Sequence, residues 1–528
     1  MQINFIKKKN NLIDILVFIF FSFLIFAILN YTNNFYNTEN NLRHWTTIHD
    51  ELHQVYNALL YNNGFKHEYI AHPSAILILL LSIQIKIFQL LTFIDISNIN
   101  EFISSSDLEN NLNKLFFVSR SLIAFISIIF SISVYLFFKL ITKEVFISFL
   151  LTIIFIFSSG FLTVVNTIGS EQLSALLLFL SLFFLCNFLT KKEKSELYLF
   201  LFFIFIFASI IQKMQVFFLI IPSLFSLVYF LRDKNDLNLS KLNFNYTKKN
   251  FFLIFFFVSL IIFLKSFVAY KSIESFGFLI TNYFLLNLLF YFFIKKYQSE
   301  IYKNLIIYNI LLISSYILLK LVFSFHPSSN LEIFNISFAR MFTYIKSYIA
   351  KDAEGFLPID NSFEYVSHFF YYFKIVINKF FLQVNFQSLL IYFNLGCLLV
   401  FCNKNLKAYI STFLLISIFL YIQVFSSFRS GEYYSYFIFS EFFLILSLAI
   451  LLNDIKRTYF KRILVSLFII PLIFNNFELI NTQKFVNNKN SCGVLFVSDE
   501  QIEMRYNTHY KTWTNKFPLE IVKQFCKY

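Results

Sequence analysis

Residues 49–74 read HDELHQVYNALLYNNGFKHEYIAHPS. This polar stretch is rich in carboxylates, imidazoles and tyrosines, and it lies between two strongly apolar runs. The topology of the whole chain depends on it and on the apolar run that follows at 75–94, because each crossing of a bilayer reverses the side on which later residues lie. We expect water-facing chemistry to be concentrated in this stretch.

The composition is that of a membrane protein. Hydrophobic residues make up 58% of the chain and charged residues only 14%, whereas charged residues are roughly a quarter of a soluble domain. A formal net charge of +14 would favour nucleic acid as the partner of a soluble protein, but a membrane protein collects lysine and arginine on one side of the bilayer. We therefore expect an all-α polytopic membrane protein whose partners are membrane lipids and not nucleic acid.

The apolar runs give the candidate spans. Lys7, Lys8 and Lys9 precede the run from Leu12 to Leu29, which is longer than a signal-peptide core and is expected to be a retained first span. Further runs, several of them near the ~20 residues that a span needs, lie at about 75–94, 115–138, 145–165, 172–190, 197–211, 216–231, 250–270, 277–294, 304–325, 380–402, 408–427, 437–453 and 463–475.

The run at 75–94 decides the topology. If it spans, the acidic segment 95–114 becomes cytoplasmic and the basic loops that follow lie outside. If it is an interfacial or re-entrant helix, those basic loops lie inside with the N-terminal lysines, as the positive-inside rule requires. We therefore expect about thirteen transmembrane helices, a cytoplasmic N-terminus, an extracytoplasmic C-terminus and one interfacial helix within a first extracytoplasmic loop at 30–114. The expected location is a bacterial plasma (inner) membrane.

This topology divides the chain into four parts. An N-terminal transmembrane module at 1–325 contains the first loop, and an extracytoplasmic loop follows at 326–378. C-terminal transmembrane helices at 379–475 precede an extracytoplasmic tail at 476–528, where Cys492 and Cys526 could form a disulfide if the tail is outside the cytoplasm. The remaining cysteines lie in apolar runs and are expected to be buried hydrophobic residues.

The polar stretch begins with a predicted amphipathic helix from Ile48 to Asn62, which Asn63 and Gly64 would end. Its polar side is predicted at four positions spaced by three or four residues: Asp50, Gln54, Asn57 and Tyr61. Such a helix would lie on the outer membrane surface and present Asp50 and Glu51 near its N-terminus. The alternative is that Thr47 and Asp50 form a capping box, although a capping box does not need the neighbouring His49, His53 and His72.

Two ionisable residues stand at predicted outer ends of later spans. Glu171 follows Ser170 where one span returns as the next, and it is either a solvated helix cap or a partner of Asp50. Lys213 is a cation between two apolar runs, and it either extends to lipid headgroups or meets an anionic substrate.

Three arginines lie on the extracytoplasmic side, against the usual bias. They are Arg120 near the start of the 115–138 run, Arg340 in the 326–378 loop, and Arg429 four residues before Tyr433. Because arginine binds phosphate oxygens in a bidentate manner, anion binding is the natural hypothesis for Arg429. Arg120 could instead pair with Asp107 or Glu109.

Several of these residues together resemble the N-terminal module of the GT-C membrane glycosyltransferases. The resemblance consists of the Asp50-Glu51 pair opening a helix, with Tyr56, Ala58, Leu59 and Gly64 after it, then Tyr69, His72 and Pro73 in a Tyr-x-x-His-Pro turn, and Arg120. Within the superfamily, the pattern is most similar to the protein O-mannosyltransferase and lipid A aminoarabinose transferase branch. Many of those relatives have Lys-Pro-Pro where this chain has Ala71-His72-Pro73-Ser74, so the role of that turn and the donor preference are open.

The resemblance implies inverting transfer of a sugar from a polyprenyl-phosphate carrier to an acceptor on the outer face. Asp50 and Glu51 would then be catalytic, with Glu171 as a partner carboxylate. The other residues would bind the substrate, and the candidates for the departing phosphate are Arg429, Lys213 and Arg340; His53, Tyr69, His72, Arg120 and Tyr433 complete the site.

No cofactor is required by this scheme. A divalent metal is used in some branches of the superfamily, but no residues here have convincing ligand spacing. Two other classes of function remain. One is a transporter or flippase of lipid-linked glycans, which needs ionisable residues in mid-membrane and paired broken helices. The other is a non-catalytic assembly scaffold.

Overall fold

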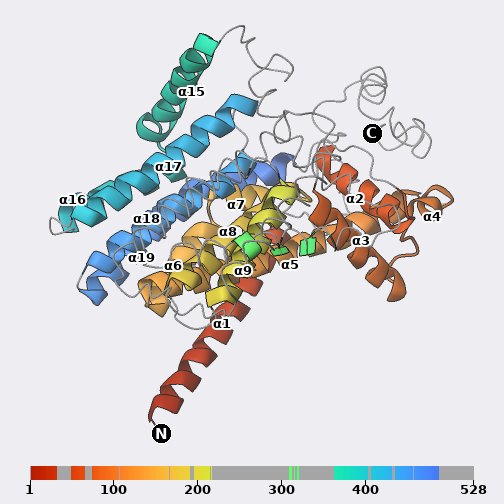
Figure 1. The fold of residues 1–528 in the computed structure, drawn as a ribbon, viewed down its shortest axis with the longest axis horizontal. Helices are drawn as coiled ribbons and strands as arrows, with labels where there is room; N and C mark the ends of the chain where they lie inside the picture. Colours follow the sequence, from red (N-terminus) through yellow and green to blue (C-terminus); the bar gives the residue numbers. More distant parts are fainter. Residues whose placement is uncertain are drawn as a thin grey trace, which may run out of the picture. The chain divides into compact units, whose positions relative to one another are not determined.

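The computed structural model describes residues 2–31, 49–65, 74–105, 108–165, 167–190, 195–213, 216, 362–401, 406–430, 434–455 and 457–486, with short pieces between 309 and 321. All regular elements in these ranges are helical, and Figure 1 shows them in chain order. Six of the helices are long and apolar enough to cross a membrane, or seven if one bent pair counts as a span. The expectation of an all-α, multi-pass membrane protein is therefore confirmed for the described residues, while the expected spans between 216 and 325 lie almost wholly outside them.

The helices follow the apolar runs closely but not everywhere. The first half of the chain forms α1 (Gln2–Tyr31), α2 (His49–Asn62), α3 (Ala75–Leu90), α4 (Ile99–Ile103), α5 (Leu108–Thr142), α6 (Val145–Ile156), α7 (Ser159–Val164), α8 (Ser170–Thr190) and α9 (Ser195–Gln212). The second half forms α15 (Ser362–Leu382), α16 (Phe386–Phe401), α17 (Leu406–Ser430), the 3₁₀ helix η2 (Tyr434–Phe439), α18 (Glu441–Asp454) and α19 (Thr458–Val486).

Two boundaries differ from the expectation. The loop expected at 326–378 is already helical from Ser362, and the tail expected from 476 is helical up to Val486. A helix begins and ends where its backbone hydrogen bonds do, and polar residues such as Asn475 and Gln483 continue those bonds as well as apolar ones. The apolar runs therefore mark the lipid-compatible part of a helix rather than its ends.

Three expected spans are interrupted. The run at 145–165 divides into α6 and α7 at residues 157–158, and the run at 380–402 divides at residues 383–385, where the two halves bend by 72°. The run at 437–453 begins as η2 and becomes α18 only after Ser440. Hydropathy averaged over a whole run does not register these interruptions, because each break adds only one or two polar residues to an apolar run.

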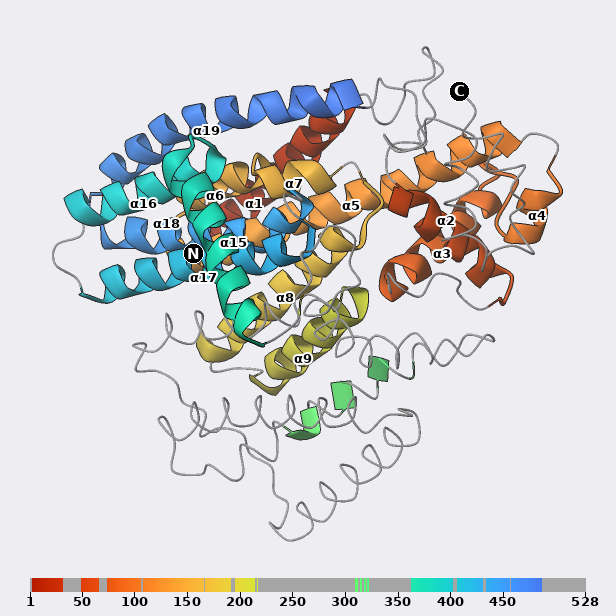
Figure 2. The ribbon, with the colours of Figure 1, turned by 90° about the horizontal axis from the view of Figure 1, so that it is seen from above.

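The chain forms two compact units. The first comprises residues 1–69, 77–173 and 370–528, and the second comprises 70–76 and 174–369. In the first unit, Figure 2 shows α16, α17, α18 and α19 packed with α5 and α6, while α2, α3 and α4 lie together at one end of α5. In the second unit, α8 and α9 form an antiparallel pair: Ser174 and Ser209 each donate a hydroxyl hydrogen bond to the other's carbonyl, at 3.0 and 2.8 Å.

An ion pair fixes the direction of α1 relative to α5. The Lys139 ammonium near the end of α5 lies 2.6 Å from both carboxylate oxygens of Asp14, near the start of the apolar part of α1. The Tyr135 hydroxyl donates to the same carboxylate at 2.8 Å. The two helices are therefore antiparallel, and the end of α1 lies at the same end of the bundle as the start of α5.

If α1 and α5 both cross a membrane, an even number of crossings, or none, lies between them. The helix α3 packs beside the first half of α5, where the Gln84 amide donates to the Val118 carbonyl at 2.9 Å and to the Ser121 hydroxyl at 2.7 Å. A surface ion pair at 3.8 Å between Asp95 and Lys114 lies at the same end of α5. The non-crossing alternative for the run at 75–94 stays a prediction.

Candidate functional site

The helix α2 carries the candidate catalytic residues, and it is held by its last residue. The Asn62 amide donates to the carbonyls of Ser82 and Ser97, at 3.1 and 2.8 Å, and so joins α2 to α3 and to the segment before α4. Gly64 ends the helix with a φ of +75°, a conformation that glycine adopts without strain. The expected helix and its stop signal are therefore both present.

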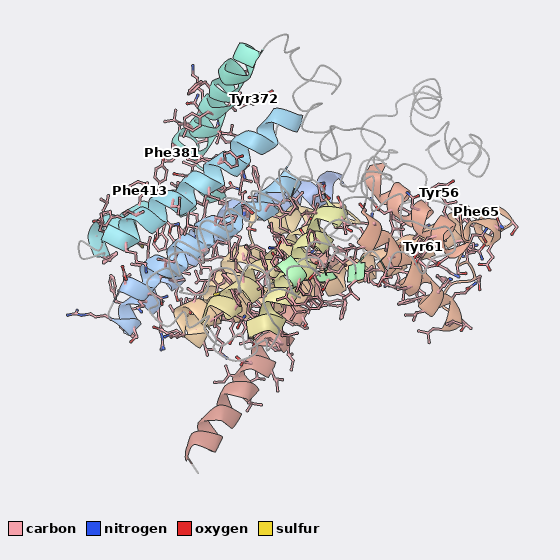
Figure 3. The ribbon with its side chains drawn as sticks, viewed as in Figure 1. Tyr56, Tyr61, Phe65, Tyr372, Phe381 and Phe413 are labelled. Atoms are coloured by element: carbon pink, nitrogen blue, oxygen red, sulfur yellow. The ribbon has the colours of Figure 1, made fainter. Side chains whose placement is uncertain are left out.

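The polar side of α2 does not face water as expected. Gln54 and Asn57 are each only 3% exposed, as deeply buried as Val55 and Tyr56 on the apolar side. The structure corrects the expectation of a surface helix: α2 is covered on both sides, because α4 and the start of α5 pack against it. Tyr61 continues the polar stripe, and burial raises the pKa of its phenol. Figure 3 shows Tyr56, Tyr61 and Phe65 within this group of helices.

Asp50, Glu51 and His53 lie in the first and second turns of α2, and their side chains lie outside the described part of the structure. Helical spacing nevertheless assigns Asp50 a face, because residues four and seven positions apart share one side of a helix. Asp50 precedes Gln54 by four residues and Asn57 by seven, and both of these are buried.

Glu101 stabilises the segment beside α2. Its carboxylate accepts hydrogen bonds from the Ser97 amide at 2.7 Å and from the Gln89 amide at 3.1 Å, while the Asn98 side chain caps α4. Burial alone would raise the pKa of Glu101, but the hydrogen bonds from Ser97 and Asn98 outweigh it and lower the pKa. Residues 97–104 thus form an ordered support for the end of α2.

Arg120 is buried against the same end of α5. It is 4% exposed, and its guanidinium carbon lies 5.7 Å from the centre of the Phe116 ring. A guanidinium so deeply buried needs charge-assisted hydrogen bonds to offset its loss of hydration. Its alternative partners Asp107 and Glu109 have side chains outside the described residues.

Glu171 begins α8 close to the face of α5 that carries Arg120. The neighbouring Gln172 is completely buried and donates its amide to the Ser127 hydroxyl of α5 at 2.5 Å. Ser127 lies seven residues after Arg120, on the same side of α5. The structure thus places the first turn of α8 against α5 at Ser127, on the side that carries Arg120, and α2 also contacts α5.

The other site residues predicted from the sequence are not placed beside α2, α5 or the start of α8 by any described contact. Lys213 belongs to the second unit, directly after α9, and is 4% exposed. A side chain buried to this degree does not extend to lipid headgroups, which was one of its two expected roles. Arg429 lies in the last turn of α17, but its side chain lies outside the described residues. Tyr69, His72, Arg340 and Tyr433 also lie outside them.

The structure reveals one polar cluster that the sequence analysis missed. Glu441, the first residue of α18, is completely buried. Its carboxylate accepts hydrogen bonds from the Gly160 backbone amide at 2.8 Å and from the Gln387 side-chain amide at 2.5 Å. The signal that could have found it is an acidic residue in the run FIFSEFFLIL, which is otherwise apolar except for Ser440.

The cluster extends across two further helices. Gln387 also donates to the Ser159 hydroxyl at 3.0 Å, and that hydroxyl lies 3.4 Å from the Asn476 side-chain oxygen. Asn476 in turn donates to the Phe157 carbonyl at 2.6 Å, at the break between α6 and α7. We call Glu441, Gln387, Ser159, Asn476 and Gly160 the buried junction.

Known proteins give no further guide to the site. Comparisons with models of protein families, with characterised proteins and with solved structures gave no match to this chain. Within the described residues, no three histidine, cysteine, aspartate or glutamate side chains are grouped closely enough to hold a metal ion. The geometry of the residues themselves must therefore carry the functional argument.

Proposed function

We propose that this protein is a membrane glycosyltransferase that moves a sugar from a polyprenyl-phosphate donor to a lipid, glycan or protein acceptor. The observation that carries the proposal is the buried polar face of α2, with Gln54 and Asn57 each 3% exposed. α5, which bears the buried Arg120, contacts this helix, and the first turn of α8, which carries Glu171, packs on α5 at Ser127. A site for transfer from an anionic lipid needs a carboxylate, a cation and shelter from water, and our candidates for these are Asp50, Arg120 and the buried side of α2.

The proposed reaction is a single inverting displacement. The acceptor hydroxyl oxygen forms a bond to the anomeric carbon while the bond between that carbon and the phosphate oxygen breaks. The phosphate leaves with the bonding electron pair, and the hydroxyl proton passes to Asp50. Glu51 and Glu171 orient the acceptor, His53, Tyr69 and His72 contact the sugar, and the cations Arg120, Lys213, Arg340 and Arg429, with Tyr433, hold the phosphate.

The proposal includes a GT-C-like arrangement in a bacterial plasma membrane, with the N-terminus cytoplasmic, the C-terminus extracytoplasmic and about thirteen spans. A surface of α3 supports the interfacial role of that helix. Its exposed side carries Ile83, Ile87, Leu90 and Leu91, with exposed fractions of 47 to 81%. These positions follow one another at four, three and one residues, Leu91 directly after the end of α3, and form one apolar stripe that would contact lipid at the membrane surface.

The experiment compares Asp50→Asn with Asp95→Asn in the full-length protein in native membranes. The control removes a carboxylate from the same segment, but one that is 80% exposed and joined to Lys114 only across 3.8 Å. We expect Asp50→Asn to abolish a surface sugar modification and to cause accumulation of its lipid-linked donor, whereas Asp95→Asn leaves both unchanged. Full transfer by Asp50→Asn, at equal expression, would refute the proposal.

A second candidate function has one observation in its favour. A transporter or flippase of lipid-linked glycans requires ionisable groups within the membrane and interrupted helices. Glu441 is completely buried in a helix that qualifies as a span, and it lies beside two helix interruptions. Release of a labelled lipid-linked glycan across vesicles containing Asp50→Asn protein would favour this candidate, because a transporter does not need that carboxylate as a base.

A further inference from the structure

We propose that the buried junction around Glu441 is a binding site for one monovalent cation, either a proton or Na⁺, within the transmembrane part of the first unit. This site is separate from the proposed transfer site and does not depend on it. Support for this site comes in three parts: the missing countercharge, the interrupted helices and the hydrogen-bonding capacity of the neighbours.

The first part is the missing countercharge. Elsewhere in the described chain, acidic side chains form ion pairs, as Asp14 does with Lys139, Glu144 with Lys461, and Asp95 with Lys114. Glu441 is not among them, although it is the most completely buried acid in the described chain. An ionised carboxylate in a low-dielectric interior costs several kcal/mol without a cation beside it. A bound cation or a proton removes that cost.

The charged groups described on the surrounding elements do not supply the countercharge. On α5, Lys139 and Tyr135 bind Asp14, and on α19, Lys461 binds Glu144. On α15, the Lys379 ammonium lies over the Phe437 ring, 5.5 Å from its centre, and does not pair with Glu441. At the far end of α18, Asp454 is exposed. The Glu441 carboxylate is instead surrounded by neutral groups, namely the Gly160 amide, Gln387, Ser158 and Ser159.

The second part is the convergence of interrupted helices. Glu441 starts α18 directly after η2, Gly160 follows the break between α6 and α7, and Gln387 follows the break between α15 and α16. Interrupted helices within a membrane leave backbone groups without helical partners, and such places commonly hold ions. Here the Phe157 carbonyl at one break and the Ser159 hydroxyl beside it add oxygen atoms to the junction.

The third part is that the side chains around Glu441 can hydrogen-bond to it both when the cation is absent and when it is bound. The Gln387 amide donates to an ionised Glu441. Rotation of that amide by half a turn presents its oxygen instead, and this oxygen accepts from a protonated carboxyl or coordinates Na⁺ together with Ser159 and Asn476. A carboxylate held only as a structural anchor would not need an exchangeable partner of this kind.

The test uses the purified full-length protein, the variant Glu441→Gln and the control Asp454→Asn. The control removes an exposed acid from the other end of the same helix. The first measurement is the half-time of thermal unfolding at neutral pH in NaCl against choline chloride at equal ionic strength. The second is the infrared band of protonated carboxyl groups, recorded by difference between the wild type and each variant.

Either of two results supports the site. If Na⁺ is the ligand, saturating NaCl slows unfolding of the wild type and of Asp454→Asn, by roughly 100-fold at 100 times Kd, but does not slow Glu441→Gln. If a proton is the ligand, NaCl has no such effect, and a protonated carboxyl band present in the wild type is missing from Glu441→Gln alone. Should Glu441→Gln fail to fold, Gln387→Leu retains the carboxyl and should shift that band or weaken the Na⁺ effect.

The proposal fails if the wild type shows neither a Na⁺ effect nor a protonated carboxyl at neutral pH, because Glu441 would then be a bare structural carboxylate. None of these measurements uses sugar transfer. A negative result would therefore leave the proposed enzyme untouched, and a positive result would not prove it.

Discussion

Replacing Gly160 with alanine should strongly destabilise the first unit, because α7 and η2 approach each other at the level of the backbone. A Cβ atom added to Gly160 would lie 2.1 Å from the Ile438 nitrogen, 2.5 Å from the Phe437 carbonyl carbon and 2.6 Å from the Ile438 Cα. All three are backbone atoms, so a side-chain rotation cannot relieve the clash. The two segments must separate by about 1 Å to restore ordinary contact distances.

The magnitude has two parts. Overpacking of a dense interior typically costs about 1–3 kcal/mol. Separation by about 1 Å also breaks the 2.8 Å hydrogen bond from the Gly160 amide to Glu441, and such a bond contributes about 0.5–1.5 kcal/mol when the carboxyl is protonated and about 1.5–3 kcal/mol when it is ionised. We expect the free energy of unfolding to fall by about 3 kcal/mol. If the whole effect falls on the unfolding rate, that rate increases by roughly 150-fold.

The assay is the half-time of unfolding of the purified protein in detergent at a fixed temperature, since membrane proteins often unfold irreversibly. Gly396→Ala is the matched control: this glycine lies within α16, and an added Cβ would meet no atom within 4 Å. Alanine favours a helix interior by about 1 kcal/mol over glycine, so the control should unfold no faster than the wild type. Equal half-times for the two variants would refute the close approach of α7 and η2.

Three further predictions follow from described contacts. Asp14→Asn should destabilise the packing of α1 on α5 by about 1–3 kcal/mol, because Lys139 and Tyr135 lose a shared carboxylate; a cycle with Lys139→Met that shows no coupling between the two sites would contradict this. Asn62→Ala should remove both bonds that hold the end of α2, at a cost of about 1–2 kcal/mol, and should speed proteolysis between α2 and α4, unlike Asn98→Ser, which keeps a capping oxygen. Because the folded pKa of Glu101 is lowered, its stabilisation is present above its unfolded value of 4.5 and disappears as pH falls through the lowered pKa; hydrogen exchange of residues 97–104 should rise in acid for the wild type but vary little with pH in Glu101→Gln.

The sequence predicts the helices well where a local signal marks them. The spacing between Ile48 and Asn62 and the stop at Gly64 both correspond to the observed α2, since amphipathic spacing and a positive φ are local properties of the chain. Charge counting favours the non-crossing alternative for 75–94 because it sums many weak preferences along the chain. That topology stays a prediction.

Features that depend on tertiary contacts were not predicted. The burial of Gln54 and Asn57 follows from α4 and α5 covering α2, and a helix pattern alone cannot say what packs on its polar side. The break before Gly160 arises where α7 meets η2, nearly 280 residues later in the chain. Glu441 was overlooked for the same reason, because its hydrogen-bond partners come from α7 and α16.

The bond between Asp14 and Lys139 also constrains how the protein is made. Asp14 is synthesised 125 residues before Lys139, and ribosomes add about 5–20 residues per second, so the first helix waits roughly 6–25 s before its counterion emerges. During that interval Asp14, near the start of the apolar part of α1, has not yet paired with Lys139, and the insertion machinery or lipid headgroups must accommodate its charge. Docking of α1 is therefore a late event in biogenesis, and slowing translation between the two codons should lengthen the time during which the nascent chain is exposed to quality-control proteases.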